Sequence, residues 1–207
     1  MSTYGLGFDF GTSGARINVV EEENLEVVYE ASCSYSDQTP QVWVDALESL
    51  TTNVPEEVGW RTTVRAYLTF LQIRKSIKRI SVSGTSASVM IYNTRKGLVT
   101  RGPRMYDFSA SADSVKVVSA FAPPGHTVRS PTSTLPKLIM WNQEEKIGAD
   151  EVLCHQADFL SSQFSGRTDR FVSDWNNVLK LGYDVKNLQY PQWMADLFAA
   201  QKLSTDM

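Results

Sequence analysis

The chain has 207 residues, of which 42% are apolar and 21% are charged, as in ordinary globular proteins with a buried core. The formal charge of −3 gives no electrostatic attraction to nucleic acid or to an anionic membrane surface, and we expect neither as a partner. Two cysteines and two histidines, none in a ligand-like spacing, exclude a disulfide framework and argue against a structural zinc site.

The sequence also indicates where the protein is found. No apolar run is as long as a membrane span, and no basic and apolar leader precedes the strand-like run at Tyr4. We therefore expect a cytoplasmic protein, or one of the plastid stroma, since a transit peptide that has been removed would leave no trace.

The first thirty residues predict a three-stranded meander. Its strands are "YGLGFDF", "ARINVVEE" and "LEVVYEAS", joined by short polar turns. Asp9 is the only charged residue of the first strand and lies beside the turn "GTSG". Because burying an unpaired carboxylate costs roughly several kcal/mol, Asp9 should have a partner or a function.

Two helices and two strands are predicted next. A helix begins near Pro40, and a second runs from about Pro55 to Lys75. The runs "IKRISVSG" and "SVMIYN" predict strands separated by the turn "GTSA". The predicted core face of the first helix contains Val42, Ala46, Leu47 and Leu50.

The second half alternates helices with one strand. Helices are predicted in "SASADSVKVVSAF", "TLPKLIMWNQEEK", "ADFLSSQFSG" and "YPQWMADLFAAQKL", a buried strand in "EVLCHQ" and a loop in "APPGHTVRSPTST". This order indicates a mixed α/β fold. We interpret Trp43, Trp141 and Trp175 as core residues, with a sugar-stacking role as the alternative for Trp175. Arg104 and Lys180 are interpreted as solvated surface residues.

The turn beside Asp9 has a specific chemical use. Gly11 lets the backbone approach a phosphate chain, and the turn N–H groups and the hydroxyls of Thr12 and Ser13 are donors to anionic oxygens. Asp9 suits the water shell of a Mg²⁺ ion, and Arg16 follows the turn. The alternative is a simple hairpin turn that Asp9 caps. A Walker loop, which ends in Gly-Lys-Ser/Thr before a helix, is absent from the sequence.

The segment "DFGTSGARINVV" resembles the first phosphate motif of the actin, Hsp70 and sugar-kinase superfamily, and most closely that of the FGGY carbohydrate kinases. Five later segments resemble this family in its own order: "PQVWVDALESL", "ISVSGTSASVMIYN", "RMYDFSA", "PTSTLPKLIMWNQEE" and "VLCHQADFLSSQFSGRTDRFVSDWNNVLKLGYD". The resemblance implies a ribonuclease H-like N-terminal lobe over residues 1–207, with a mixed sheet flanked by helices.

The resemblance also implies ligands. The hairpin would bind ATP and Mg²⁺, and "GTSAS", "SPTSTLPKL" and "SDWNNVLKLGYD" are similar to the plant and cyanobacterial D-ribulose kinase branch, which implies a ketopentose acceptor. Thr85 and Ser86 stand where relatives contact sugar. Asp107 and Asp174 are further candidate sugar ligands, since a carboxylate accepts hydrogen bonds from vicinal hydroxyls. The alternatives are a plain β-turn at "GTSA", a helix N-cap for Asp107 and a turn cap for Asp174.

Two departures from the family pattern bear on activity. In "YDFSA", Phe108 and Ala110 replace a carboxylate and a guanidinium. The family's catalytic base, second phosphate motif and adenine pocket lie beyond Met207, so we expect this chain alone to be inactive. A missing C-terminal lobe or a protein partner would cover its exposed face. A second hypothesis is a short, non-catalytic relative that acts as a binding or scaffold subunit of a larger assembly.

Overall fold

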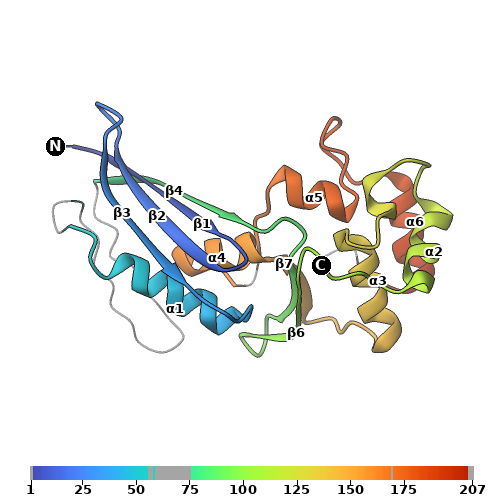
Figure 1. Cartoon of the computed structure of the whole chain (residues 1–207). Coiled ribbons are helices and arrows are strands. Elements are labelled where there is room, and N and C mark those ends of the chain that lie inside the picture. Colours follow the sequence, from blue (N-terminus) through green and yellow to red (C-terminus); the bar gives the residue numbers. More distant parts are fainter. Residues whose placement is uncertain (1, 56–57, 59–75, 169, 205–207) are drawn as a thin grey trace. The chain divides into compact units, whose positions relative to one another are not determined.

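The computed structural model describes residues 2–55, 58, 76–168 and 170–204 (Figure 1). The chain forms two compact units. Unit 1 comprises Met1–Thr85 and Ala157–Val172, and unit 2 comprises Ser86–Gln156 and Ser173–Met207. The helix predicted from Pro55 to Lys75 falls almost entirely outside the described residues.

Unit 1 is built on a mixed four-stranded sheet with the order β3-β2-β1-β4. The three-stranded meander predicted from the sequence is confirmed, and β4 adds to it in parallel with β1. Parallel pairing requires a crossover, and the chain between β3 and β4 contains α1, Pro40–Thr51. The strands are β1 Tyr4–Phe10, β2 Gly14–Glu21, β3 Val27–Ser34 and β4 Ile77–Gly84.

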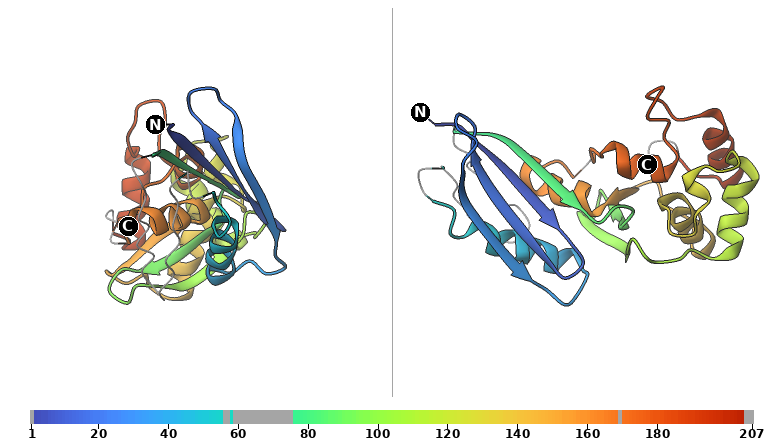
Figure 2. Two further views of the ribbon diagram at one scale, coloured as in Figure 1. Left: turned by 90° about the vertical axis from the view of Figure 1, so that its left-hand side faces the viewer. Right: turned by 45° about the horizontal axis from the view of Figure 1, so that its top comes forward.

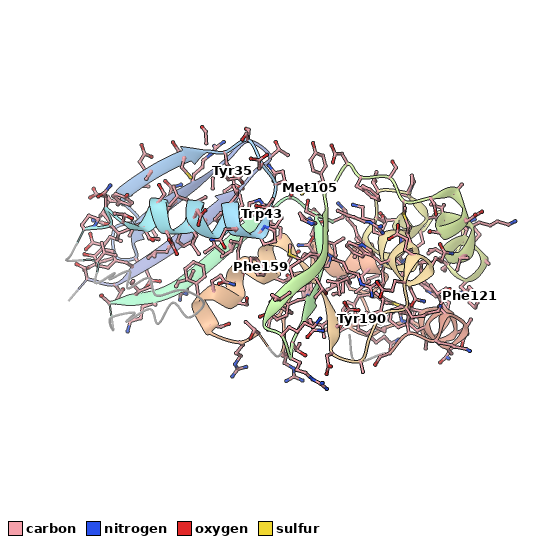
Figure 3. The ribbon with its side chains drawn as sticks, turned by 90° about the horizontal axis from the view of Figure 1, so that it is seen from below. Tyr35, Trp43, Met105, Phe121, Phe159 and Tyr190 are labelled. Carbon is pink, nitrogen blue, oxygen red and sulfur yellow. The ribbon has the colours of Figure 1, made fainter. Side chains whose placement is uncertain are left out.

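The two faces of this sheet differ because side chains alternate along a strand. On one face Phe10, Ile17 and Val19 are fully buried. Helix α1 and helix α4, Gln156–Ser165, cover this face, and the right-hand view of Figure 2 shows the sheet from the opposite side. Trp43 on α1 and Phe159 on α4 are labelled in Figure 3; both are buried. The core position predicted for Trp43 is therefore confirmed.

Local sequence explains where α1 begins and where α4 ends. Pro40 occupies the first turn of α1, where no backbone donor is needed, and the Thr39 hydroxyl accepts a hydrogen bond from the Val42 N–H. Gly166, with a φ of 65°, ends α4 as its Gly stop signal predicts.

Unit 2 contains a three-stranded antiparallel sheet with the order β6-β5-β7. The strands are β5 Val89–Asn93, β6 Leu98–Arg104 and β7 Glu151–His155. The sequence did not predict β6, because Gly102, Pro103 and two arginines interrupt its alternation. Arg101 is held in this strand by Glu151, at 2.9 Å.

Helices enclose an apolar cluster around this sheet. They are α2 Ala112–Phe121, α3 Thr134–Glu144, α5 Trp175–Leu181, α6 Gln192–Gln201 and the 3₁₀ turn η2 Thr127–Arg129. The cluster includes Val89, Ile91, Val118, Leu135, Leu138, Ile139, Trp141, Leu153, Leu197 and Phe198. The sequence did not predict α5, which has only seven residues, whereas the other three helices of unit 2 were predicted.

Two predictions about single residues in unit 2 are wrong. Trp175 is 66% exposed, because it lies in the first turn of α5, whose buried residues are Asn177 and Leu181. Arg104 is only 8% exposed. Its guanidinium lies 2.6 Å from both carboxylate oxygens of Glu144 and within 5 Å of the rings of Trp141 and Phe108, so a paired and stacked cation replaces the predicted surface residue.

The described part of the chain contains no helix that is both long and apolar enough to cross a membrane. Neither cysteine is part of a disulfide: Cys154 is buried and Cys33 is half-buried.

Candidate functional site

The predicted phosphate-binding residues of unit 1 share one concave surface. The turn from Gly11 to Gly14 joins β1 to β2, and a concavity of about 810 Å³ extends from it along β2 and β3. All five predicted cofactor-binding residues line this concavity: Asp9, Gly11, Thr12, Ser13 and Arg16. The structure therefore brings together the residues that the sequence motif selected.

Asp9 lies on the solvent side of the sheet, directly opposite Arg16 in the β1–β2 ladder. Asp9 therefore pays no burial cost, because side chains alternate along β1 and this one points to solvent. The alternative that Asp9 caps the turn is wrong: its carboxylate makes no hydrogen bond or ion pair with any described residue. A single accessible carboxylate fits a Mg²⁺ ion that retains most of its waters.

The carbonyl groups of the turn are held by the segment that follows β3. The Tyr35 hydroxyl donates to the Gly11 carbonyl at 2.7 Å, and the Tyr35 N–H donates to the Ser13 carbonyl at 3.1 Å. The Gln38 amide donates to the Thr12 carbonyl. Three consecutive carbonyl oxygens, which would repel an anion, are thus occupied by protein donors.

Two N–H groups of the same turn make no such hydrogen bonds with described residues, whereas the Gly11 N–H donates to the Gly14 carbonyl at 2.9 Å. Within the part of the chain that the structure describes, the amide N–H groups of Thr12 and Ser13 have no acceptor. Both residues are exposed, so their hydroxyls are accessible too. Successive free N–H groups in a turn form a concave anion-binding element. The role of these groups in phosphate binding stays a prediction.

Tyr35 and Gln38 were missed by sequence reasoning. Burial, with smaller effects of Cys33 and Asp9, raises the pKa of Tyr35 to about 12. The phenol therefore stays protonated and remains a donor to the Gly11 carbonyl at any physiological pH. No local signal in the sequence marks this contact, because 24 residues separate its partners.

Gly14 has a structural reason to be glycine. A Cβ atom at this position would lie 2.4 Å from the Cys33 carbonyl oxygen on the neighbouring strand. The sequence interpretation explained glycine in this turn by the close approach of a phosphate chain. For Gly14 the close approach of β3 is a sufficient reason, and no ligand is needed to explain it.

In unit 2, the candidate sugar-binding residues Ser86 and Asp174 are connected through α5. The Asn176 amide donates to the Ser86 hydroxyl at 3.0 Å, and Asn177 donates to Asp174 through its backbone N–H and through its side-chain amide. Asp174 is the N-cap of α5, which confirms the capping alternative. Its role as a sugar ligand stays a prediction.

Asp107 is exposed in the turn that follows β6. Helix α2 is capped instead by Ser111, which accepts a hydrogen bond from the Ser114 N–H, so the N-cap alternative for Asp107 is wrong. Asp107 lies close enough to the buried Lys137 to stabilise its charged form. Thr85 is half-buried. It is the last residue of the first segment of unit 1, whereas Ser86 begins unit 2.

Comparison with known proteins supports the fold. No protein-family model matches the sequence. Xylulose kinase from Bifidobacterium adolescentis matches with a TM-score of 0.68 and 18% identity over 97% of this chain and 45% of its own. A xyloylose kinase from Brucella ovis matches with a TM-score of 0.67 and 21% identity over 96% of this chain and 40% of its own.

A structure of Plasmodium falciparum glycerol kinase with ADP also matches, with a TM-score of 0.64 and 13% identity over 97% of this chain and 41% of its own. The fold is therefore the mixed α/β fold of a sugar-kinase N-terminal domain, with sheets flanked by helices. The chain spans less than half the length of these kinases.

Proposed function

We propose that this chain is the N-terminal lobe of an ATP-dependent carbohydrate kinase that phosphorylates a ketopentose, D-ribulose or D-xylulose. One observation carries the proposal: in the turn from Gly11 to Gly14 three carbonyls are occupied while the N–H groups of Thr12 and Ser13 are free. The kinase fold of the structural neighbours supports the same class of activity.

In this proposal the hairpin holds the phosphate chain. The N–H groups and hydroxyls of Thr12 and Ser13 donate to phosphate oxygens, and Arg16 offsets their charge. Asp9 accepts hydrogen bonds from the water shell of Mg²⁺. When bound, the ion neutralises charge on the phosphates. The donor set fits this role because the Asp9 carboxylate is exposed and unpaired among the described residues.

Ser86, Asp107 and Asp174, all in unit 2, are the proposed sugar ligands, and Thr85, which belongs to unit 1, stays a candidate from the sequence alone. Hydroxyl and carboxylate groups suit a polyol, because each accepts hydrogen bonds from its hydroxyls. The exposed indole of Trp175 adjoins Asp174 in the sequence and gives an apolar face against which a sugar ring or chain can pack. In this proposal Trp175 takes the sugar-stacking role that was the alternative to a core position.

Transfer of the phosphoryl group also needs a base on the acceptor hydroxyl. The family resemblance places this base, and the nucleotide clamp, beyond Met207. We therefore propose that residues 1–207 bind ligands weakly and turn over only as part of a longer chain, whose second lobe covers the exposed face. The intact mass of the protein from its native source tests this point: a mass well above 23.2 kDa is expected.

Calorimetry with Mg²⁺ and ATP, or with tripolyphosphate in place of ATP, tests the hairpin. We expect binding that is lost on removal of Mg²⁺ with EDTA and weakened at least about tenfold, or about 1.4 kcal/mol, by Asp9→Asn. Asp37→Asn is the matched control, because Asp37 is an exposed carboxylate that contacts Ser36 and not the turn. Equal binding by wild type and Asp9→Asn would contradict the phosphate assignment.

A second titration tests the acceptor. D-ribulose and D-xylulose are compared with glycerol and gluconate, and Trp175 fluorescence reports binding, with Trp175→Phe as the control for the other four tryptophans. We expect a preference for the ketopentoses that Ser86→Ala and Asp107→Asn reduce. If glycerol or gluconate binds more tightly, the ketopentose is wrong as the acceptor, while the assignment to carbohydrate kinases still stands.

One observation favours the alternative, a non-catalytic binding or scaffold subunit. Phe108 packs against the Arg104 guanidinium, and Ala110 is buried, so these two departures from the family pattern serve packing in this chain. Under this alternative the protein has a native mass near 23.2 kDa, forms a stable complex with a partner and shows no sugar binding by calorimetry.

A further inference from the structure

Lys137 on α3 is a cation with no exposed surface. Lysine is rarely buried in this way unless its ammonium group is paired. Its Nζ donates to the carbonyl of Ala87 at 2.9 Å and to the carbonyl of Met105 at 2.7 Å. Two segments far apart in the sequence are thus joined by one side chain.

The first of these contacts holds a strained turn. Ala87 has a φ of 65°, a left-handed conformation that a residue with a Cβ atom adopts only at a cost. The Ala87 N–H donates to the buried side chain of Asn177 at 3.0 Å, while its carbonyl accepts from Lys137. Both backbone groups of the strained residue are therefore held by side chains, and Ser86 immediately precedes it.

The second contact holds the turn that carries Asp107. The Met105 carbonyl accepts hydrogen bonds from Lys137 and from the Phe108 N–H, which closes the turn around Tyr106 and Asp107. Met105 is labelled in Figure 3. The Tyr106 N–H donates to the Ser88 hydroxyl at 3.0 Å, so this turn is also joined to the residue after Ala87.

We propose that Lys137 is a positioning residue that fixes Ser86 and Asp107 relative to each other for a polyhydroxyl ligand. The ligand in this inference rests on the proposed function, whereas the effect of Lys137 on the conformation of Ala87 does not. Lys137 does not contact the ligand, because it is fully buried. It acts by holding the carbonyls of Ala87 and Met105.

The test uses Lys137→Met, which keeps an unbranched side chain only one atom shorter and removes the ammonium group. In wild type the intraresidue HN–Hα NOE of Ala87 should be strong, since these protons approach closely only at positive φ. We expect Lys137→Met to weaken this NOE and to lower the affinity for D-ribulose or D-xylulose at least about tenfold. Lys116→Met, on the exposed face of α2, is the control and should change neither.

Ala87→Gly in the Lys137→Met background separates positioning from general stability. Glycine adopts positive φ without a steric cost, so this second substitution should restore a large part of the affinity. If Lys137→Met does not fold, Asn177→Ala removes the other support of the same residue. Because the Asn177 amide also donates to Asp174, Ala87→Gly should relieve only the part of its affinity loss that arises at Ala87.

The outcomes are distinguishable. An unchanged NOE in Lys137→Met, or a loss of affinity that Ala87→Gly does not relieve, overturns the positioning role. If wild type binds none of the sugars, the proposed function fails, whereas a weakened NOE in Lys137→Met still supports the action of Lys137 on the turn.

Discussion

The chain uses the tripeptide Gly-Thr-Ser in two turns, and the structure holds the two turns in opposite ways. In the first, at Gly11–Ser13, neighbouring groups bind the carbonyls and leave N–H groups free. In the second, at Gly84–Ser86, the next residue, Ala87, has its N–H and its carbonyl both bound by buried side chains. The same tripeptide therefore stands in two turns that side chains from elsewhere in the fold hold at different backbone groups.

The difference shows how a turn acquires its chemistry. Free N–H groups attract an anion, so the first turn suits phosphate. After the second turn, Lys137 and Asn177 bind the backbone groups of Ala87. The Ser86 hydroxyl, which accepts a hydrogen bond from Asn176, is a polar group suited to a neutral polyol. Substitutions in the groups that hold each turn should therefore have different effects.

Gly14→Ala should have the largest effect on the first turn. The new Cβ atom would lie 2.4 Å from the Cys33 carbonyl, so β2 and β3 must separate locally. We expect the free energy of unfolding to fall by about 2–3 kcal/mol in urea titration. Gly7→Ala on β1 is the control, because nothing lies within 4 Å of its added Cβ atom. Equal losses in the two variants would show that the contact with Cys33 is easily relieved.

Asn177→Ala should be the most damaging change to the second turn. It leaves the buried Ala87 N–H without its acceptor, at a cost of about 2 kcal/mol. Asn176→Ala, which removes only an exposed contact with Ser86, should cost about 0.5 kcal/mol. Thermal unfolding of both variants measures the difference. A similar cost for both would mean that the second turn does not depend on a buried acceptor.

Tyr35→Phe tests the support of the first turn. Loss of the bond to the Gly11 carbonyl should cost about 1 kcal/mol of stability and weaken magnesium-dependent ATP binding. Tyr29→Phe is a matched control, because the Tyr29 hydroxyl also donates to a carbonyl, that of Leu50 on α1. We expect it to lower stability by a similar amount and to leave ATP binding unchanged. A parallel loss of ATP binding in Tyr29→Phe would assign the effect to stability alone.

The pH dependence of stability, which is confined to alkaline pH, should have opposite signs for the two turns. Burial lowers the pKa of Lys137 from 10.5 to about 8, against the attraction of Asp107, while Lys180 and Arg104 lower it further. Between these values the unfolded chain binds more protons, so this residue makes stability rise with pH.

Tyr35 has a folded pKa of about 12 against an ordinary 10, so the folded chain binds more protons in that interval and stability falls. Urea midpoints measured against pH should lose the rise in Lys137→Met and the fall in Tyr35→Phe. If the urea midpoint changes with pH equally in wild type and in a variant, the substituted residue does not cause the pH dependence of stability.

Much of the molecule could be predicted from the sequence because the signals are local. Runs of apolar residues predicted the strands β1 to β5 but not how they pair. Pro40 predicted where α1 begins, and Gly166 predicted where α4 ends. The phosphate hairpin was recognised because Asp9 and the turn are adjacent in the sequence. Side-chain spacing and turn-forming residues can be recognised from a few neighbouring residues.

Only the tertiary structure decided which groups these turns expose. Tyr35 and Gly11 are 24 residues apart, Lys137 and Ala87 50, and Asn177 and Ala87 90, so no local pattern reports their contacts. The same holds for β6, where Arg101 and Arg104 break the strand pattern until Glu151 and Glu144 are brought to them. Buried polar groups must find partners, and those partners are set by the fold rather than by sequence separation.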